Sequence, residues 1–482
     1  MSVRQLLLLS IAVLVPCILL AVGNRRALLA WVGITLSVHI FDTSILTNLP
    51  AGRIVGLIYL PLAILSAPWW LRLRPAQAWL LNFAYLVVLG IAFGYIWPWP
   101  DTTGHRPLTM TAPGRAVIYS IRLISDLSLA VFVARELQKP GRIAVLGRAI
   151  VLGASLTALA GIFNFITTID PYFTITGLRD LAGNQRARGL SFEPRGLGMA
   201  CAYGLMVLIV MPGRLSLHRQ GLLGINLLGL LVSYSTSALV IFVAGLAAAW
   251  LFLSNRIRLT IASIMLATGA LVAAAPLVVP DQFEVALRSV QQRLDPSSGL
   301  RTEPPDHLGE VIAYRMDSFD ASALLFLWDQ PTYALIGTGP GMMLLPASEY
   351  VPPGIYRLIY PPEKGLDGLP THGLLLEVSN SGVIGLSMWL VQVFSCYGAL
   401  RILARQRAEP ETARNWRFAR DLFLIGTIFY VIQVSLTSPV WSIFLGIGWA
   451  AAAIVAQRRS AAQRRIPDSE PSTTPPEYAP IT

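Results

Sequence analysis

Long apolar runs separated by short polar connections make up most of the chain up to residue 456. A helix that crosses the hydrocarbon core of a bilayer needs roughly 20 mostly apolar residues. Such runs predict about thirteen membrane-spanning helices, near residues 5–22, 27–43, 54–70, 77–97, 114–134, 143–168, 196–211, 220–233, 236–253, 258–279, 373–400, 421–437 and 440–456. The two runs on either side of Ser235 are short, and either two tilted helices or one long broken helix would explain them.

This pattern predicts an all-α polytopic integral membrane protein with about 12–13 transmembrane helices. Residues 280–371 have no comparable apolar run and are expected to form one large loop outside the membrane. The other expected parts are N-terminal transmembrane helices at 1–168, core transmembrane helices at 169–279 with an arginine-rich segment at 169–195, C-terminal transmembrane helices at 372–456 and a disordered tail at 457–482. The tail is assigned from its Pro, Ser and Thr content.

Composition agrees with a membrane protein and argues against nucleic-acid binding. Apolar residues make up 54% of the chain and charged residues only 13%, whereas a soluble domain usually carries about 25% charge. The formal net charge is +11, but the basic residues lie mainly in short clusters between apolar runs. That distribution is typical of membrane topology and not of a nucleic-acid-binding surface.

The basic clusters also predict an orientation. All of them fall on one side of the expected helices, and the positive-inside rule makes that side cytoplasmic. The clusters are Arg25-Arg26, Arg72/Arg74, Arg135 to Arg148, Arg214/Arg219, Arg256/Arg258, Arg401 to Arg420 and Arg458 to Arg465. The tail is then cytoplasmic, while segment 169–195 and loop 280–371 face the other side. An odd number of spans places the N-terminus on that other side as well.

Segment 169–195 carries four arginines on the side where positive charge is normally avoided. They are Arg179, Arg186, Arg188 and Arg195. A guanidinium offers a planar fork of donors that matches phosphate oxygens in pairs, so the four would suit a lipid-linked phosphate or diphosphate. Contact with anionic lipid headgroups is the alternative, as are ion pairs with the acids of the same segment. These acids are Asp170, Asp180 and Glu193.

His372 stands where the long loop re-enters the membrane. Histidine exchanges protons near neutral pH, so at this boundary it can accept a proton from a hydroxyl group. An ordinary interfacial polar residue at the start of a helix is the alternative. Gly382 and Gly385 follow on the same expected helix, and small residues at such spacing let another helix approach closely.

Two features lie inside the large loop. A helix-like run covers Val311 to Trp328 and carries Arg315, a candidate phosphate-facing cation. Gly337-Thr338-Gly339-Pro340-Gly341 follows it. That sequence lacks the Lys-Ser/Thr of a nucleotide phosphate loop, so we expect a tight turn that orders the loop.

Arg122 and Asp126 fall inside one expected span with i, i+4 spacing. Charges within a membrane normally pair or face a cavity, so these two could form a structural ion pair or part of a substrate passage. No metal site is expected, because the histidines are scattered and no HExxH or DxD motif occurs. Asp317 and Asp320 share one helix face, which is typical of solvated acids.

Four motifs in order resemble the O-antigen ligase and polysaccharide polymerase superfamily, over roughly residues 180–395. The first two are Arg186-Ala-Arg188-Gly-Leu-Ser-Phe-Glu193-Pro194, entering a helix, and the Ser/Thr-rich break at Tyr234 to Ala238. The large loop with Arg315 and its glycine-rich turn comes next, then His372 with its glycine pair. The chain departs from the family pattern at Gly373, where the family usually has Asn, and at Ala238, where it usually has Arg.

The resemblance implies a GT-C-like membrane fold with a periplasmic loop in the bacterial inner membrane. It also implies transfer of a glycan from undecaprenyl diphosphate to an acceptor sugar at the periplasmic face, without a metal or other cofactor. Arg186, Arg188 and Arg315 would stabilise the departing diphosphate, with Arg179, Glu193 and Arg195 in the binding site. His372 would orient or deprotonate the acceptor hydroxyl.

A polysaccharide polymerase is the favoured member of this superfamily, because Glu193-Pro194 stands where ligases more often carry Asn-Pro. An O-antigen ligase, which attaches the glycan to lipid A-core, is the close alternative. A transporter or flippase of lipid-linked sugars comes next, although the chain has no evident internal repeat. Expected partners are the lipid-linked oligosaccharide, the acceptor glycan, the bilayer, a chain-length regulator and a flippase.

Overall fold

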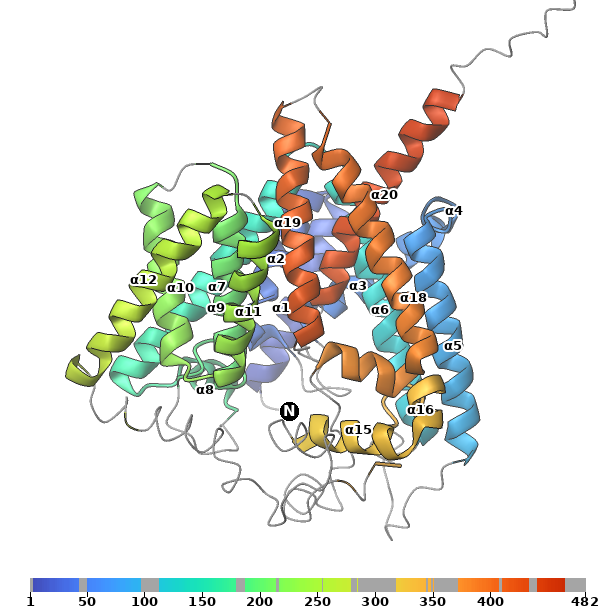
Figure 1. The fold of residues 1–482 in the computed structure, drawn as a ribbon, viewed down its shortest axis with the longest axis horizontal. Helices are drawn as coiled ribbons and strands as arrows, with labels where there is room; N and C mark the ends of the chain where they lie inside the picture. Colours follow the sequence, from blue (N-terminus) through green and yellow to red (C-terminus); the bar gives the residue numbers. More distant parts are fainter. Residues whose placement is uncertain are drawn as a thin grey trace, which may run out of the picture.

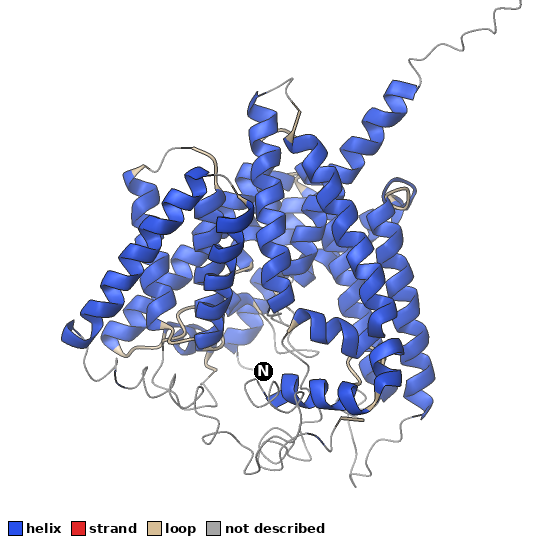
Figure 2. Ribbon diagram, viewed as in Figure 1, coloured by secondary structure: helices blue, strands red, loops and turns tan. Residues whose placement is uncertain are grey.

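The computed structural model is all-helical over the residues that it describes, and it contains no strand there (Figure 2). The described residues are 3–42, 50–96, 112–178, 187–213, 216–253, 255–278, 284, 318–343, 346–347, 350, 372–406, 410–432 and 440–463. The prediction of an all-α protein is therefore confirmed for this part of the chain.

The helices follow one another with short connections (Figure 1). The first half of the chain contains α1 (Val3–Ala21), α2 (Arg25–Thr35), the 3₁₀ helix η1 (His39–Phe41), α3 (Ala51–Leu65), α4 (Ala67–Trp70), α5 (Arg74–Ile96), α6 (Ala112–Leu137), α7 (Arg142–Thr167), α8 (Pro171–Thr176) and α9 (Pro194–Val210). The second half contains α10 (Leu217–Val232), α11 (Thr236–Phe252), α12 (Asn255–Val278), α15 (Ser318–Asp329), α16 (Pro331–Ile336), α18 (Gly373–Ala404), α19 (Pro410–Ile432) and α20 (Val440–Gln463).

Six of these helices are long and apolar enough to cross a membrane. They are helices α1, α5, α6, α7, α18 and α20. Five shorter apolar segments, in α3, α9, α10, α11 and α12, accompany them. Large apolar side chains face outward on the long helices, for example Leu14 on α1, Val88 on α5 and Phe394 on α18. An apolar outer surface of this kind suits lipid and not water, so the structure supports a helical membrane protein.

Two predictions about individual spans have clear outcomes. The expected span 27–43 is wrong as a continuous helix, because α2 ends at Thr35 and the chain continues into η1. The short runs around Ser235 are two helices, α10 and α11. Tyr234 separates them with a left-handed backbone (φ 46°), and the Ser235 side chain caps α11 by accepting from the Ala238 N–H.

The helices pack into one bundle whose core runs through both halves of the chain. Helices α7 and α9 to α12 form one side of the bundle in Figure 1, and α3, α5, α6, α18 and α20 form the other. Close contacts join α6 to both α3 and α20, and α18 to α5. Trp449, Phe132 and Phe423 are among the largest fully buried side chains. This packing brings residues from distant spans to the same interior region.

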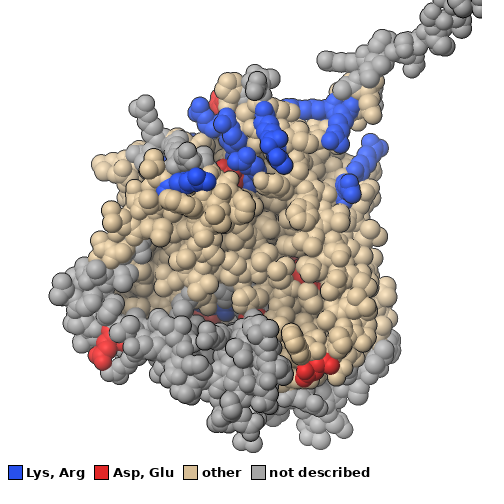
Figure 3. Space-filling model, viewed as in Figure 1, with Lys and Arg blue, Asp and Glu red and all other residues tan. Residues whose placement is uncertain are grey.

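The two ends of the bundle differ in charge. Lys and Arg side chains gather at one end of the face seen in Figure 3. At the opposite end lie the short helices α8, α15 and α16 (Figure 1). The predicted helix-like run 311–328 overlaps α15, although residues 311–317 lie outside the described part of the chain.

Helix α18 is broken near its start. Gly382 has φ 63° and ψ −170°, a combination that is essentially confined to glycine. The first segment, residues 373–381, lies across the bundle, and the second, residues 383–404, runs along it (Figure 1). The predicted close approach at Gly385 is confirmed, because a Cβ there would lie 2.8 Å from the Asn82 side chain of α5.

Candidate functional site

A polar cavity of about 120 Å³ lies inside the bundle on the side formed by α3, α5, α6, α18 and α20. Its polar and charged lining residues are Arg53, Asn82, Tyr119, Arg122, Asp126, Glu377, Asn380, Gln392, Tyr430 and Ser442. Polar groups inside apolar spans are costly unless they have a role in pairing or binding, so this cavity is the candidate functional site.

An ion pair forms one wall. The guanidinium of Arg53 on α3 donates from Nε to Asp126 Oδ1 at 3.0 Å and from Nη2 to Asp126 Oδ2 at 3.1 Å. The Ser125 hydroxyl also donates to the Arg53 carbonyl oxygen at 2.8 Å, which fixes α3 against α6. The sequence offered Arg122 and Asp126 as a structural ion pair or as part of a substrate passage, and both line the cavity. The bidentate partner of Asp126, however, is Arg53 from another helix.

A carboxylate and an aromatic cluster form the facing wall. Tyr430 on α19 donates its hydroxyl proton to Glu377 Oε1 on α18 at 2.5 Å. The Tyr430 ring stacks on Trp441 (centroids 4.7 Å apart) and on Trp389 (5.7 Å). The rings fix the position of the Tyr430 hydroxyl, and through it the Glu377 carboxylate, next to the cavity.

Asn380 connects the cavity to the glycine-rich turn at 337–341. Its Nδ2 donates to the Tyr119 hydroxyl oxygen at 3.0 Å, and its Oδ1 accepts from the Gly341 N–H at 3.0 Å. The turn also forms hydrogen bonds with main-chain carbonyl groups that lie next to the break in α18. Thr338 N–H donates to Ser379 O at 2.8 Å, and Gly339 N–H donates to Asn380 O at 3.0 Å.

Three glycines of this turn have positive φ values, 84° at Gly337, 88° at Gly339 and 72° at Gly341. Glycine adopts these angles without steric cost, which explains why the segment is rich in it. The prediction of a tight turn is confirmed for residues 337–341, and its role in ordering the loop stays a prediction.

Three buried polar atoms around the cavity have no hydrogen-bond partner within the described part of the chain. They are Trp389 Nε1, Gln392 Nε2 and Asn82 Oδ1. Trp389 is 3% exposed and Gln392 is 2% exposed. Buried polar atoms in proteins are usually paired. Twelve such atoms lack a partner among the described residues, and these three belong to residues that line one cavity.

His372 caps the first segment of α18 beside a buried acid. Its backbone N–H donates to Asp320 Oδ1 on α15 at 3.1 Å, and its Nε2 lies 4.0 Å from Asp320 Oδ2. The His372 side chain is 41% exposed, whereas that of Asp320 is 1% exposed. Sequence reasoning took Asp320 for a solvated acid, but the fold buries it against the His372 main chain, with its carboxylate near the imidazole and beyond hydrogen-bond distance.

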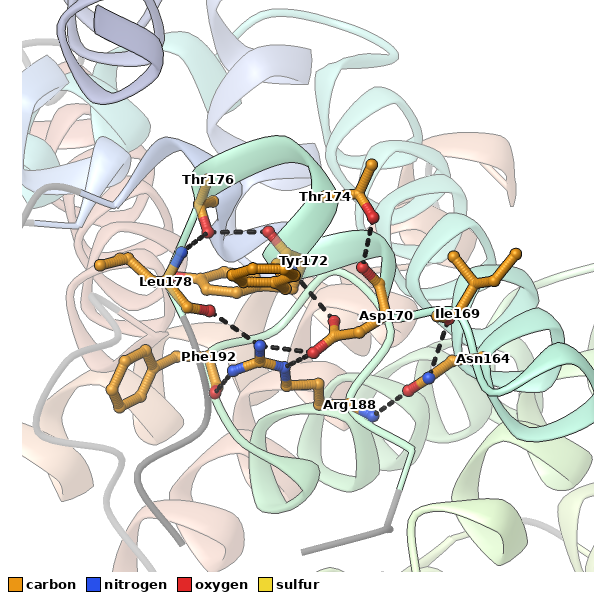
Figure 4. Close-up of polar contacts among 10 residues, drawn as sticks. Asn164, Ile169, Asp170, Tyr172, Thr174, Thr176, Leu178, Arg188 and Phe192 are labelled. Atoms are coloured by element: carbon orange, nitrogen blue, oxygen red, sulfur yellow. Dashed lines mark hydrogen bonds and ion pairs between the residues drawn. The ribbon is translucent and has the colours of Figure 1, made fainter. Parts of the chain in front are cut away.

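Arg188 belongs to a separate, closed cluster at the same end of the bundle as α8 (Figure 4). Its Nε donates to Asp170 Oδ2 at 2.7 Å, its Nη1 to Phe192 O at 3.1 Å and its Nη2 to Leu178 O at 2.8 Å. The guanidinium also lies over the Tyr172 ring, 4.9 Å from its centroid. Burial raises the pKa of the Tyr172 hydroxyl, which keeps this ring neutral.

These contacts give Arg188 the role that the sequence left as the alternative, an ion pair with Asp170. The side chain is 2% exposed and its donors bind protein acceptors. Glu193 is exposed at the cap of α9, and Arg195 lies in the first turn of that helix. Arg179, Arg186 and Arg315 lie outside the described residues.

The lining of the cavity includes neither Arg188, Arg195 nor His372. The cavity residues missed by sequence reasoning include Arg53, Glu377 and Tyr430. A charged residue within or beside an apolar run is a signal that could have identified the first two. Tyr430 carries no such signal, because tyrosine is common near membrane interfaces.

Comparisons with protein-family models and with curated proteins return no match for this chain, so the family resemblance stays a prediction from its motifs. Among the described residues, no three His, Cys, Asp or Glu side chains form a group that could hold a metal ion. Whether the reaction uses a metal stays a prediction as well.

Proposed function

We propose that the protein is a membrane glycosyltransferase, a polysaccharide polymerase of GT-C-like fold that uses an undecaprenyl-diphosphate-linked glycan as donor. One observation carries the proposal. A histidine held by a buried acid, His372 with Asp320, begins a broken helix whose next two turns line a polar intramembrane cavity. An acid–histidine pair beside a cavity for polar groups suits transfer to a hydroxyl.

The charge distribution supports a periplasmic site. If the arginine-rich end faces the cytoplasm, then α8, α15, α16 and His372 belong to the periplasmic end of a bacterial inner-membrane protein. The diphosphate of a translocated lipid carrier lies at that level of the bilayer. The lipid tail then remains in the membrane while the sugars reach loop 280–371.

The chemistry is a displacement at the anomeric carbon of the donor sugar. His372 takes the proton of the acceptor hydroxyl, the hydroxyl oxygen forms the new glycosidic bond, and the bond from the anomeric carbon to the diphosphate oxygen breaks. The diphosphate leaves with the electron pair, so cations placed near it lower the barrier. Because it is a good leaving group already, the scheme requires no cofactor.

The arginines proposed to bind the diphosphate are Arg179, Arg186, Arg195 and Arg315, with Glu193 beside them. Arg188 contributes indirectly, because its ion pair with Asp170 lies within segment 169–195, which also carries Arg179, Arg186 and Arg195. Asp320 orients His372 and stabilises its protonated form during transfer.

The test is glycan synthesis in a deletion strain complemented with variants. His372→Ala and Arg186→Ala are each expected to abolish polymer, while His218→Ala, an exposed histidine on α10, leaves polymer unchanged. Equal amounts of each variant in the membrane fraction exclude loss of the protein. Wild-type polymer from both His372→Ala and Arg186→Ala would overturn the proposal.

The intermediate that accumulates in the deletion strain separates the polymerase from the ligase. A lost polymerase leaves single repeat units on the lipid carrier, whereas a lost ligase leaves full-length chains on it. A chain-length regulator and a flippase are the expected partners in either case.

A transporter of lipid-linked sugars is the second candidate, favoured by one observation. The cavity lies beside a discontinuous helix, α18, as substrate sites of secondary transporters do. In that case the deletion strain would accumulate repeat units on the cytoplasmic leaflet, and they would be inaccessible to a periplasmic glycosidase.

A further inference from the structure

The unpartnered groups around the cavity have a common geometry. Trp389 and Gln392 are three residues apart on the second segment of α18, so they share one helix face. Asn82 comes from α5, the helix that packs against that segment. Two donors and one acceptor, on residues that line the same cavity, therefore have no protein partners among the described residues, and each of these atoms is closed off from water in this structure.

The charged lining residues balance one another. Counted by formal charge, Arg53 and Arg122 are two cations and Asp126 and Glu377 are two acids. A diphosphate would meet no net counter-charge here and would desolvate beside two carboxylates, which is unfavourable. The balance favours a neutral polar ligand.

The unpartnered groups match hydroxyls. A hydroxyl donates one hydrogen bond and accepts up to two, so it can accept from Trp389 Nε1 or Gln392 Nε2 and donate to Asn82 Oδ1. Glu377 adds a further acceptor, because Tyr430 occupies only part of the hydrogen-bonding capacity of its carboxylate. Aromatic rings at Trp79, Trp389 and Trp441 supply apolar surface alongside these groups.

We propose that the cavity is a binding subsite for a neutral sugar of the acceptor glycan, which inserts its hydroxyl-bearing edge between α5 and α18. Trp389 and Gln392 donate to sugar oxygens, while Asn82 and Glu377 accept from sugar hydroxyls. This inference rests on the proposed function, and it names the cavity as a substrate site separate from the diphosphate-binding arginines.

The competing explanation is that ordered water alone satisfies these groups. Saturation-transfer NMR on the purified full-length protein in detergent separates the two. The probes are methyl glycosides of glucose, galactose, N-acetylglucosamine and rhamnose, with inorganic diphosphate as competitor. At least one glycoside is expected to bind, and diphosphate is not expected to displace it.

Two variants test whether the glycoside binds in this cavity. The double variant Trp389→Phe with Gln392→Leu removes both donors, keeps an aromatic ring at 389 and a side chain of similar size at 392, and it is expected to weaken glycoside binding at least tenfold. Trp31→Phe is the matched control, because Trp31 Nε1 is also buried without a partner but lies on α2, outside the cavity. This control is expected to bind like the wild type.

Three results would overturn the inference: no glycoside binds the wild-type protein, the double variant binds as tightly as the wild type, or diphosphate displaces the sugar. Failure of the proposed function has a different signature. If the deletion strain makes normal polymer while the glycoside still binds, the cavity recognises sugars but the protein is not the polymerase. If polymer is lost and no glycoside binds, the enzyme proposal stands and the subsite does not exist.

Discussion

Two polar regions inside the same bundle are built in opposite ways. The Arg188 cluster satisfies a buried guanidinium with Asp170 and two carbonyl oxygens. The cavity between α5 and α18 keeps Trp389, Gln392 and Asn82 without protein partners. Satisfied polar networks stabilise one conformation, whereas unsatisfied buried groups cost stability and persist where a ligand completes them. We therefore interpret the Arg188 cluster as structural and propose the cavity as the region that binds a ligand.

Loss of the Arg188 side chain tests the structural region and has the largest expected effect. Arg188→Ala leaves Asp170 without its cation, and breaking a buried pair costs about 3–5 kcal/mol. We expect the lower end, because Asp170 is 29% exposed and water can partly replace the arginine. Thermal unfolding in detergent measures the change.

The control for this variant is Arg4→Ala. Arg4 also donates to the α8 region, at Thr174 O, but from an exposed position, so its removal should cost under about 1 kcal/mol. If Arg188→Ala unfolds at the same temperature as Arg4→Ala, the cluster does not stabilise the protein.

Gly382→Ala tests how strongly the cavity depends on the break in α18. The φ of 63° costs an alanine about 1–3 kcal/mol, and the new Cβ would clash with the Leu335 carbonyl oxygen. We expect lower thermal stability together with loss of polymer. Gly398→Ala, on the same helix with open space around its Cα, should have neither effect. Wild-type stability in Gly382→Ala would show that the break is not required.

Thr338→Val tests the contact between the glycine-rich turn and the broken helix. The buried Thr338 hydroxyl donates to Ser379 O at 2.7 Å, and losing one such bond costs about 0.5–1.5 kcal/mol. Thr338→Ser keeps the hydroxyl and is expected to retain more of the stability. If the valine variant is as stable as the serine variant, this hydrogen bond does not contribute to the stability of the protein.

Gln392→Leu has the smallest expected effect on stability, and the direction of that effect tests whether the Gln392 amide lacks a protein partner. Because Gln392 Nε2 has no protein partner in the described chain, an apolar side chain of similar size removes an unpaired donor. We expect unchanged or slightly higher thermal stability. A loss above about 1 kcal/mol would mean that the amide is satisfied within the protein.

Much of the architecture could be predicted from the lengths of the apolar runs, because a run of about 20 apolar residues predicts a membrane-spanning helix. The end of α2 at Thr35 could not be predicted, because the apolar run continues past Thr35 whereas the helix ends there and η1 follows. The α18 break depends on φ at Gly382, and a glycine in an apolar run does not reveal its backbone angle.

The site was predicted only in part, because its contacts join distant helices. The sequence identified Arg122 and Asp126, which line one wall of the cavity. It did not identify Arg53, which pairs with Asp126 but lies 73 residues before it in the sequence. Arg188 was assigned to the diphosphate, with an ion pair to Asp170 as the alternative, because local charge cannot decide between the two. Asp320 and His372, 52 residues apart, meet only when α15 packs against the start of α18.

The glycine-rich turn fastens to α18 largely through main-chain atoms, Thr338 and Gly339 N–H to Ser379 and Asn380 carbonyl oxygens. Main-chain hydrogen bonds depend on the position of the backbone and little on the identity of the side chain. Packing adds to them here, because Met342 and Met343, directly after the turn, are fully buried. Residues 337–343 therefore form one anchored unit, and a chimera that exchanges other residues of segment 280–371 should keep this unit unchanged together with Ser379 and Asn380.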